Sequence, residues 1–189
     1  DRADEQDTIL VHPGEYYDDI WFYGKNVVLG SLFLTTGDTS FLSSTIIDGD
    51  STDCTIAIYG NIDSTCRITG FTIQNGIGCV YGQGAGIYVE SASPRLDNLI
   101  IKNNISGTNG GGICLNGNSN SLIDKVLIKN NSADVGGGLY SFNSNPVITN
   151  SIIQNNHANN GAGVFLELCS PNFENVSITD NNAISSGGG

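Results

Sequence analysis

The residues best suited to chemistry are carboxylates at close spacing. The segment DGDSTD places Asp48, Asp50 and Asp53 within one short turn, and such oxygen donors suit Ca²⁺. The EF-hand pattern is not completed, because no Glu stands twelve positions after the first Asp. An exposed acidic turn without a metal is the alternative interpretation. The sequence therefore indicates no cofactor other than calcium, with these three aspartates as its candidate ligands.

Acid–base residues are present but are not grouped. Asp18 and Asp19 are adjacent, so on a strand they would point to opposite faces. Glycoside cleavage requires two carboxylates that face the same sugar. His12 and His157 lie far apart in the sequence. These patterns predict no catalytic residues and favour a chain that is not an enzyme, although they leave an enzymatic role open.

The chain has 5 cysteines, an odd number, and their spacing matches no zinc-ligand pattern. Cys54 and Cys66 flank two short predicted strands and are the best candidates for a disulfide. Buried free thiols are the alternative.

Composition excludes several classes of partner. The 189 residues carry 7 Lys and Arg against 19 Asp and Glu, for a net charge of −12. Such a surface repels phosphate backbones and anionic headgroups, so we expect no nucleic-acid partner. The chain has no apolar run long enough to span a bilayer, so we expect no membrane insertion. It also has neither an initiator Met nor a signal peptide, which predicts a mature or excised segment.

One repeat organises the chain, and three separate sets of positions show it. Apolar residues preceding an Asn or Asp recur at steps of 25 to 28 residues, at Ile73, Ile101, Ile128, Ile153 and Ile178. Small-residue triplets begin at Gly84, Gly110, Gly136, Gly161 and Gly187. A third apolar file is Leu96, Ile123, Ile148 and Phe173.

Each repeat holds three short β-type runs bounded by Asn, Gly, Ser and Pro, such as VLIK, GLYSF and PVIT. Runs this short are stabilised when equivalent strands of successive repeats pair, at about 4.8 Å per coil. The predicted fold is all-β: a right-handed parallel β-helix with three strands per coil and a repeat of about 25–28 residues. Residues 1–69 are expected to form irregular N-terminal coils, and residues 70–189 regular ones.

The recurring Asn and Gly residues are predicted to form the corners of the coil. Asn tolerates left-handed backbone geometry, and stacked amides can hydrogen-bond as a ladder. The expected ladder consists of Asn75, Asn103, Asn130, Asn155 and Asp180. We interpret these residues as structural, with no ligand. His157 occupies a corner position equivalent to Ser132 and Asn182, which indicates a solvated residue.

An outward stripe is the best candidate for a binding surface. If the preceding apolar residues point inward, Tyr88, Cys114, Tyr140 and Phe165 point outward. An exposed aromatic stripe of Tyr88, Tyr140 and Phe165 could bind sugar rings or another protein. The alternative is that a loop of a neighbouring coil, or cross-strand stacking alone, covers it.

Three N-x-Ser sequences start at Asn104, Asn130 and Asn175. They would be glycosylation sites in a source that modifies Asn.

The run ILVHPGEYYDDIWFYGKNVVLGS, followed by STIIDG, GFTIQNG and the Gly-rich repeats, resembles the pectin-lyase-like superfamily. It is similar in particular to β-helix repeat proteins of bacterial surfaces and secretions. This resemblance implies an extracellular or cell-surface location. The catalytic motifs of polygalacturonases and pectinesterases are absent, which favours a structural or adhesive role. The alternative is a carbohydrate-binding or polysaccharide-cleaving segment of a larger secreted protein.

In the proteins that this sequence resembles, an amphipathic helix usually covers the first coil. The segment DRADEQD is too short and polar for such a helix, and the sequence stops within a repeat. Open strand edges recruit further strands. We therefore expect either end-to-end self-association into filaments or coverage by further coils of a parent chain.

Overall fold

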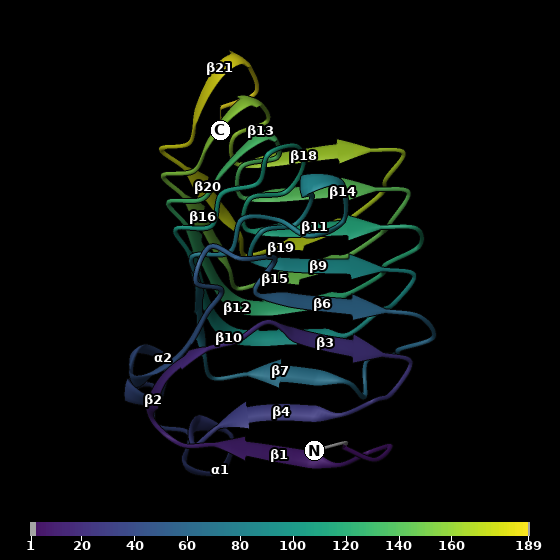
Figure 1. Ribbon diagram of the computed structural model, residues 1–189. Coiled ribbons are helices and arrows are strands. Elements are labelled where there is room, and N and C mark those ends of the chain that lie inside the picture. Colours follow the sequence, from purple (N-terminus) through teal and green to yellow (C-terminus); the bar gives the residue numbers. More distant parts are fainter. Residues whose placement is uncertain (1–2, 189) are drawn as a thin grey trace.

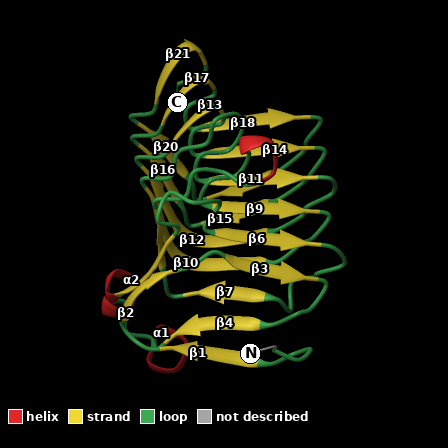
Figure 2. Ribbon diagram, in the orientation of Figure 1, coloured by secondary structure: helices red, strands yellow, loops and turns green. Residues whose placement is uncertain are grey.

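The computed structural model describes residues 3–188, which wind into a parallel β-solenoid (Figures 1 and 2). All strand pairs assigned within this range are parallel and join one coil to the next. The predicted all-β, three-strand coil is confirmed, because the strands fall into three sheets along the axis.

The largest sheet has 12 strands. One file of strands in it is β1 (Thr8–Val11), β4 (Val28–Ser31), β7 (Arg67–Thr69), β10 (Arg95–Lys102), β12 (Leu122–Lys129), β15 (Val147–Thr149) and β19 (Asn172–Glu174). The strands beside this file are β2 (Gly14–Tyr17), β5 (Thr45–Asp48), β8 (Thr72–Gln74), β16 (Ile152–Gln154) and β20 (Ser177–Thr179).

The second sheet has six strands: β3 (Ile20–Tyr23), β6 (Ile56–Tyr59), β9 (Ile87–Glu90), β11 (Ile113–Asn116), β14 (Leu139–Phe142) and β18 (Val164–Glu167). The third has three strands: β13 (Ser132–Val135), β17 (His157–Asn160) and β21 (Asn182–Ser186). Figure 1 shows the second sheet as a regular stack of arrows along one side of the solenoid.

The predicted register of the core is confirmed. Ile101 pairs with Ile73 and Ile128, and the same file continues through Ile153 to Ile178. The second file runs from Leu96 through Ile123 and Ile148 to Phe173. Most of these side chains are fully buried in one continuous apolar core. Burial at this density stabilises the stack by about 25 cal/mol for each Å² of apolar surface removed from water.

Short helices occur only outside the sheets. The helices α1 (Phe33–Thr36) and α2 (Ser40–Ser44) form an insertion between β4 and β5, on the side of the first coils (Figure 1). The hydroxyl of Thr72 in β8 donates to the carbonyl of Leu42 at 2.7 Å, which ties α2 to the solenoid. A single 3₁₀ turn, η1 (Val80–Gly82), lies in the loop before β9. None of the helices in residues 3–188 is long and apolar enough to cross a membrane.

The predicted corner residues have the expected backbone. All five adopt left-handed conformations, with φ between 55° and 60°: Asn75, Asn103, Asn130, Asn155 and Asp180. Asn103, Asn130 and Asn155 are nevertheless exposed, and the Asn75 amide donates to Asp48 at 2.7 Å. The expected ladder of their amides is therefore wrong, although the corner is in the expected place.

The asparagine ladder lies one residue further along. Its members are buried and stack in successive coils: Asn104, Asn131, Asn156 and Asn181. Each Nδ2 donates to the Oδ1 of the next member, at 2.9, 3.1 and 2.9 Å. The same Oδ1 also accepts the backbone N–H of the preceding member at 2.9–3.0 Å. Each amide therefore satisfies backbone and side chain together inside the corner.

We predict that Asn131→Ala destabilises the protein by about 2–5 kcal/mol, because each buried donor that loses its acceptor costs about 1–3 kcal/mol. The substitution removes the acceptor of both the N–H and the amide of Asn104. Urea denaturation measures the difference. The matched control is Asn130→Gly, which keeps the left-handed corner and touches no ladder bond, and should change stability by less than about 0.5 kcal/mol. Equal effects of the two substitutions would contradict the assignment of the ladder.

Candidate functional site

Three aromatic rings, two of them exposed and one half-buried, form a patch on the second sheet. Trp21 and Tyr23 extend from β3 and Tyr59 from β6, and we name these three residues the aromatic patch. The ring centroids are 6.0 Å apart for Trp21–Tyr23, 5.9 Å for Trp21–Tyr59 and 5.5 Å for Tyr23–Tyr59. The three planes are parallel to within 17°. Trp21 is 38% and Tyr23 65% exposed.

Strand alternation explains the patch. In β3 the side chain of Phe22 is buried in the core, so its neighbours Trp21 and Tyr23 point outward. Tyr23 pairs with Tyr59, and Trp21 with Ala57. The small side chain of Ala57 leaves the Trp21 indole room to approach Tyr59.

The patch is neutral and anchored at one side. The Tyr59 hydroxyl lies 3.9 Å from the Cys79 sulfur, to which it donates. Burial, followed by the nearby Cys79, raises the pKa of Tyr59, so its phenol stays protonated at physiological pH. The three rings stack on one another, and their exposed parts form an apolar surface with phenol groups at its edge.

The expected outward stripe has the predicted register but is not exposed. Tyr88 pairs with Cys114, Cys114 with Tyr140 and Tyr140 with Phe165. Tyr88 is only 3% and Tyr140 7% exposed, and Phe165 is half-buried. Cys79 and Val135 pack against this second cluster. The alternative interpretation, in which a neighbouring loop covers the stripe, therefore holds, and the stripe cannot serve as a free binding surface.

The three aspartates proposed for calcium do not converge. Asp48 is buried, and its Oδ2 accepts from the amides of Gln74 and Asn75, each at 2.7 Å. Asp50 is exposed. Within residues 3–188, Asp53 groups instead with Cys54 and Cys79, and the ligand atoms of these three residues lie within 4.8 Å of one another. The prediction that these three aspartates form one calcium site is therefore wrong.

The proposed disulfide between Cys54 and Cys66 does not form. Both residues are buried free thiols, because Cys66 packs in the main core and Cys54 in the second cluster. Burial raises the pKa of the Cys66 thiol to about 11. The neighbouring Cys79 thiol and then burial raise the pKa of Cys54. Both thiols are therefore protonated at neutral pH.

The three N-x-Ser sites differ in access. Asn104 is a fully buried member of the ladder, so its amide is not available to a glycosyltransferase in the folded protein. Asn130 and Asn175 are exposed. The amide of Asn175 donates to Asn150 at 2.8 Å.

The acid–base candidates remain dispersed. His157 is exposed and pairs with Ser132 and Asn182, as the repeat predicts. Asp18 is exposed, whereas Asp19 is half-buried and accepts from the Thr52 hydroxyl at 3.0 Å.

One charged cluster was not anticipated. Asp97 in β10 is buried and accepts from Arg67 at 2.6 and 2.7 Å and from Arg95 at 2.8 Å. Thr69 and Asn98 donate to the same carboxylate. Every oxygen of Asp97 is thus engaged by its own neighbours, which suits a clamp between β7 and β10 better than a catalytic acid or base.

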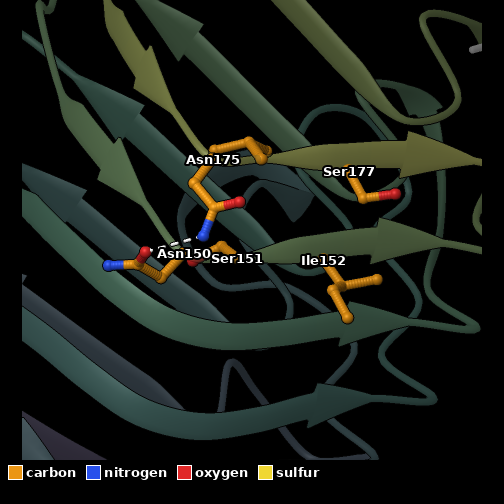
Figure 3. A pocket seen from close by; sticks show the side chains of 6 residues that line it. Asn150, Ser151, Ile152, Asn175 and Ser177 are labelled. Atoms are coloured by element: carbon orange, nitrogen blue, oxygen red, sulfur yellow. Dashed lines mark hydrogen bonds between the residues drawn. The ribbon is translucent and has the colours of Figure 1, made fainter.

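The first sheet carries two shallow hollows. One, of about 360 Å³, is lined by residues of two adjacent coils: Asn150, Ser151, Ile152, Asn175, Val176 and Ser177. Figure 3 shows the Asn175–Asn150 hydrogen bond at one side of it, with Ile152 and Ser177 on the neighbouring strands. The other, of about 270 Å³, includes Arg95 and Asp124. Asp124 already accepts from Thr149 and Asn150, so neither hollow gathers free charged groups.

Comparison with protein families decides the family. A model described as the right-handed beta helix region matches residues 30–189. The chain belongs to the right-handed β-helix family. This membership confirms the predicted fold, and it is consistent with the pectin-lyase-like superfamily. No curated protein and no solved structure matches the chain.

The aromatic patch of this β-helix was missed in the sequence, although a signal for it was present. The runs IWFYG and IAIYG contain alternating residues that share one register. Cys79 carried no such signal, because it lies in an irregular loop with no counterpart in the regular coils.

We predict that Asp97 makes the stability of the protein depend on pH in acid. Burial alone would raise the pKa of Asp97, but hydrogen bonds from Arg67, Arg95, Asn98 and Thr69 outweigh it and lower the pKa to about 2. A lowered folded-state pKa gives stability that is complete above the unfolded value of about 3.9 and is lost as the pH falls toward 2. The contribution is up to about 3 kcal/mol at neutral pH.

Urea midpoints between pH 2 and 6 measure this contribution. Asp97→Asn should flatten the acid limb of the profile, whereas Asp18→Asn, which changes an exposed carboxylate, should leave it as in the parent. An acid limb that survives in Asp97→Asn would show that other carboxylates carry it.

Proposed function

We propose that this chain is a non-catalytic adhesive β-helix of the cell surface or extracellular space, which binds a neutral polysaccharide on the aromatic patch. The observation that carries the proposal is the set of three nearly parallel rings of Trp21, Tyr23 and Tyr59. Trp21 and Tyr23 are exposed, and Tyr59 is half-buried. Rings held in this way are ordered before the ligand arrives, so binding orders few additional side chains.

Charge favours a neutral glycan over a polyuronate. The chain has a net charge of −12, and a polyanion would be repelled at moderate ionic strength. Aromatic rings bind the apolar faces of pyranose rings without needing charge. The rim of phenol groups adds hydrogen bonds, which select among sugars.

The state of the charged residues supports a role without catalysis. Asp97 is saturated by Arg67 and Arg95, and Asp48 by two amides. General acid–base chemistry on a glycoside needs carboxylates that can reach the sugar. The alternative of a polysaccharide-cleaving segment remains a distinct outcome of the experiment below.

The extracellular location and end-to-end self-association stay predictions. A solenoid held by parallel pairing suits a scaffold that displays a binding patch. Sedimentation velocity at several protein concentrations tests association. Growth of large species with concentration is the result expected of filaments.

We predict that removing one ring of the patch weakens glycan binding about two- to tenfold, since an aromatic contact contributes about 0.5–1.5 kcal/mol beyond its buried area. Trp21 is the only tryptophan, so its fluorescence reports directly on the patch. The protein is titrated with neutral glucans, mannans and xylans, with polygalacturonate as the charged comparison. Tyr23→Ala should reduce the affinity while the Trp21 signal remains available.

The matched control is Tyr17→Ala, which removes a similarly exposed tyrosine from β2 in a different sheet. It should bind as the parent does, and Trp21→Ala should lose retention in affinity electrophoresis. Lack of binding to every neutral glycan, or equal losses in Tyr17→Ala and Tyr23→Ala, would refute the patch. Release of new reducing ends in the same mixtures would favour the polysaccharide-cleaving alternative.

A further inference from the structure

A group of metal-type ligands lies where loops of successive coils meet. The ligand atoms of Asp53, Cys54 and Cys79 all lie within 4.8 Å of one another. Cys54 is buried, and the other two residues are half-buried. The Asp53 carboxylate is fixed beside Cys54, because its Oδ1 accepts the Cys54 N–H at 2.8 Å.

A fourth ligand is close by and has an unused oxygen. Asp19 Oδ1 is buried without a hydrogen-bond partner in the part of the chain that the structure describes. Its other oxygen accepts from Thr52 at 3.0 Å, and Thr52 belongs to the same loop as Asp53 and Cys54. The Asp19 charge acts on Cys54, and the Asp53 charge on Asp19. A buried carboxylate oxygen with no donor is costly unless something compensates it.

The donor set selects the kind of metal. Two thiols with one or two carboxylates combine soft and hard donors around one point, which suits tetrahedral Zn²⁺ and not Ca²⁺, whose ligands are all oxygens. The site has the negative charge that a divalent cation neutralises.

We propose that Cys54, Cys79 and Asp53 bind one zinc ion, with Asp19 as the fourth ligand. Binding converts two thiols to thiolates and releases two protons to solvent. The site needs no oxidant and does not depend on glycan binding.

Such a site would have a structural consequence. Asp19 precedes β3, Asp53 and Cys54 precede β6, and Cys79 precedes β9, so one ion would join three successive coils. Cys79 also packs against the second cluster, which contains Tyr88. Its sulfur accepts a hydrogen bond from the Tyr59 hydroxyl. Zinc would therefore fix the loop that hides Tyr88 and would support one side of the aromatic patch.

Cobalt titration of the reduced, full chain tests the site, because thiolate bound to Co²⁺ gives a near-ultraviolet charge-transfer band and visible bands of tetrahedral Co²⁺. We expect saturation at one equivalent, displacement by Zn²⁺, and a higher melting temperature with either metal. Cys54→Ser and Cys79→Ser should weaken or abolish the charge-transfer band. Asp19→Asn should lower the affinity while thiolate absorption persists.

The matched control is Cys169→Ser, which changes a half-buried thiol in a distant coil and should bind cobalt as the parent does. Circular dichroism establishes that each variant is folded, and Cys79→Ser decides the matter if Cys54→Ser does not fold. No charge-transfer band in the reduced parent, or an undiminished band in both Cys54→Ser and Cys79→Ser, would overturn the proposal. So would a Cys54–Cys79 disulfide in protein purified with zinc present, seen as the loss of two hydrogens in the unreduced mass.

Discussion

Hydrogen bonding from each coil to the next is the interaction on which the whole molecule depends. A three-strand coil cannot satisfy its own backbone, so the N–H and C=O groups of the inner strands pair with adjacent coils. The corners would break this pattern, because the chain turns there and its polar groups are buried. The ladder of Asn104, Asn131, Asn156 and Asn181 continues the pairing through the corner with side-chain amides. Register therefore holds around the entire coil, which lets outward residues of separate coils meet predictably.

This constraint explains which parts of the fold the sequence revealed. A one-residue slip would turn every inward side chain outward, so the repeat at Ile101, Ile128 and Ile153 could identify the core register. The ladder was placed one residue too early, for a related reason. Each Asn–Asn pair contains one residue suited to the left-handed turn and one suited to the buried amide, and both recur with the same period. Only the backbone path shows that the turn at Asn130 directs Asn131 into the corner.

The candidate sites were less predictable, because they depend on what covers a face. Alternation correctly placed Tyr88 and Tyr140 on the outer side of the second sheet, but it carries no information about loops. Cys79, in an irregular loop, and Val135 in β13 pack over that side. The same alternation applies to Trp21 and Tyr23, which remain accessible. Likewise, the proximity of Cys79 to Cys54 arises from the paths of two irregular loops and has no sequence period.

The irregular coils are also where both proposed binding sites lie. In the regular coils, outward positions tend to match their neighbours, and polar residues there use their hydrogen bonds on one another, as Asn175 does with Asn150 and Thr149 with Asp124. A repeated coil thus satisfies itself and leaves little for a ligand. Where the repeat is broken, as around Trp21 and Cys54, a side chain meets a different residue in the next coil. Unequal neighbours permit exposed rings and mixed ligand sets, so the departures from the repeat, more than the repeat, give this solenoid surfaces that can recognise something else.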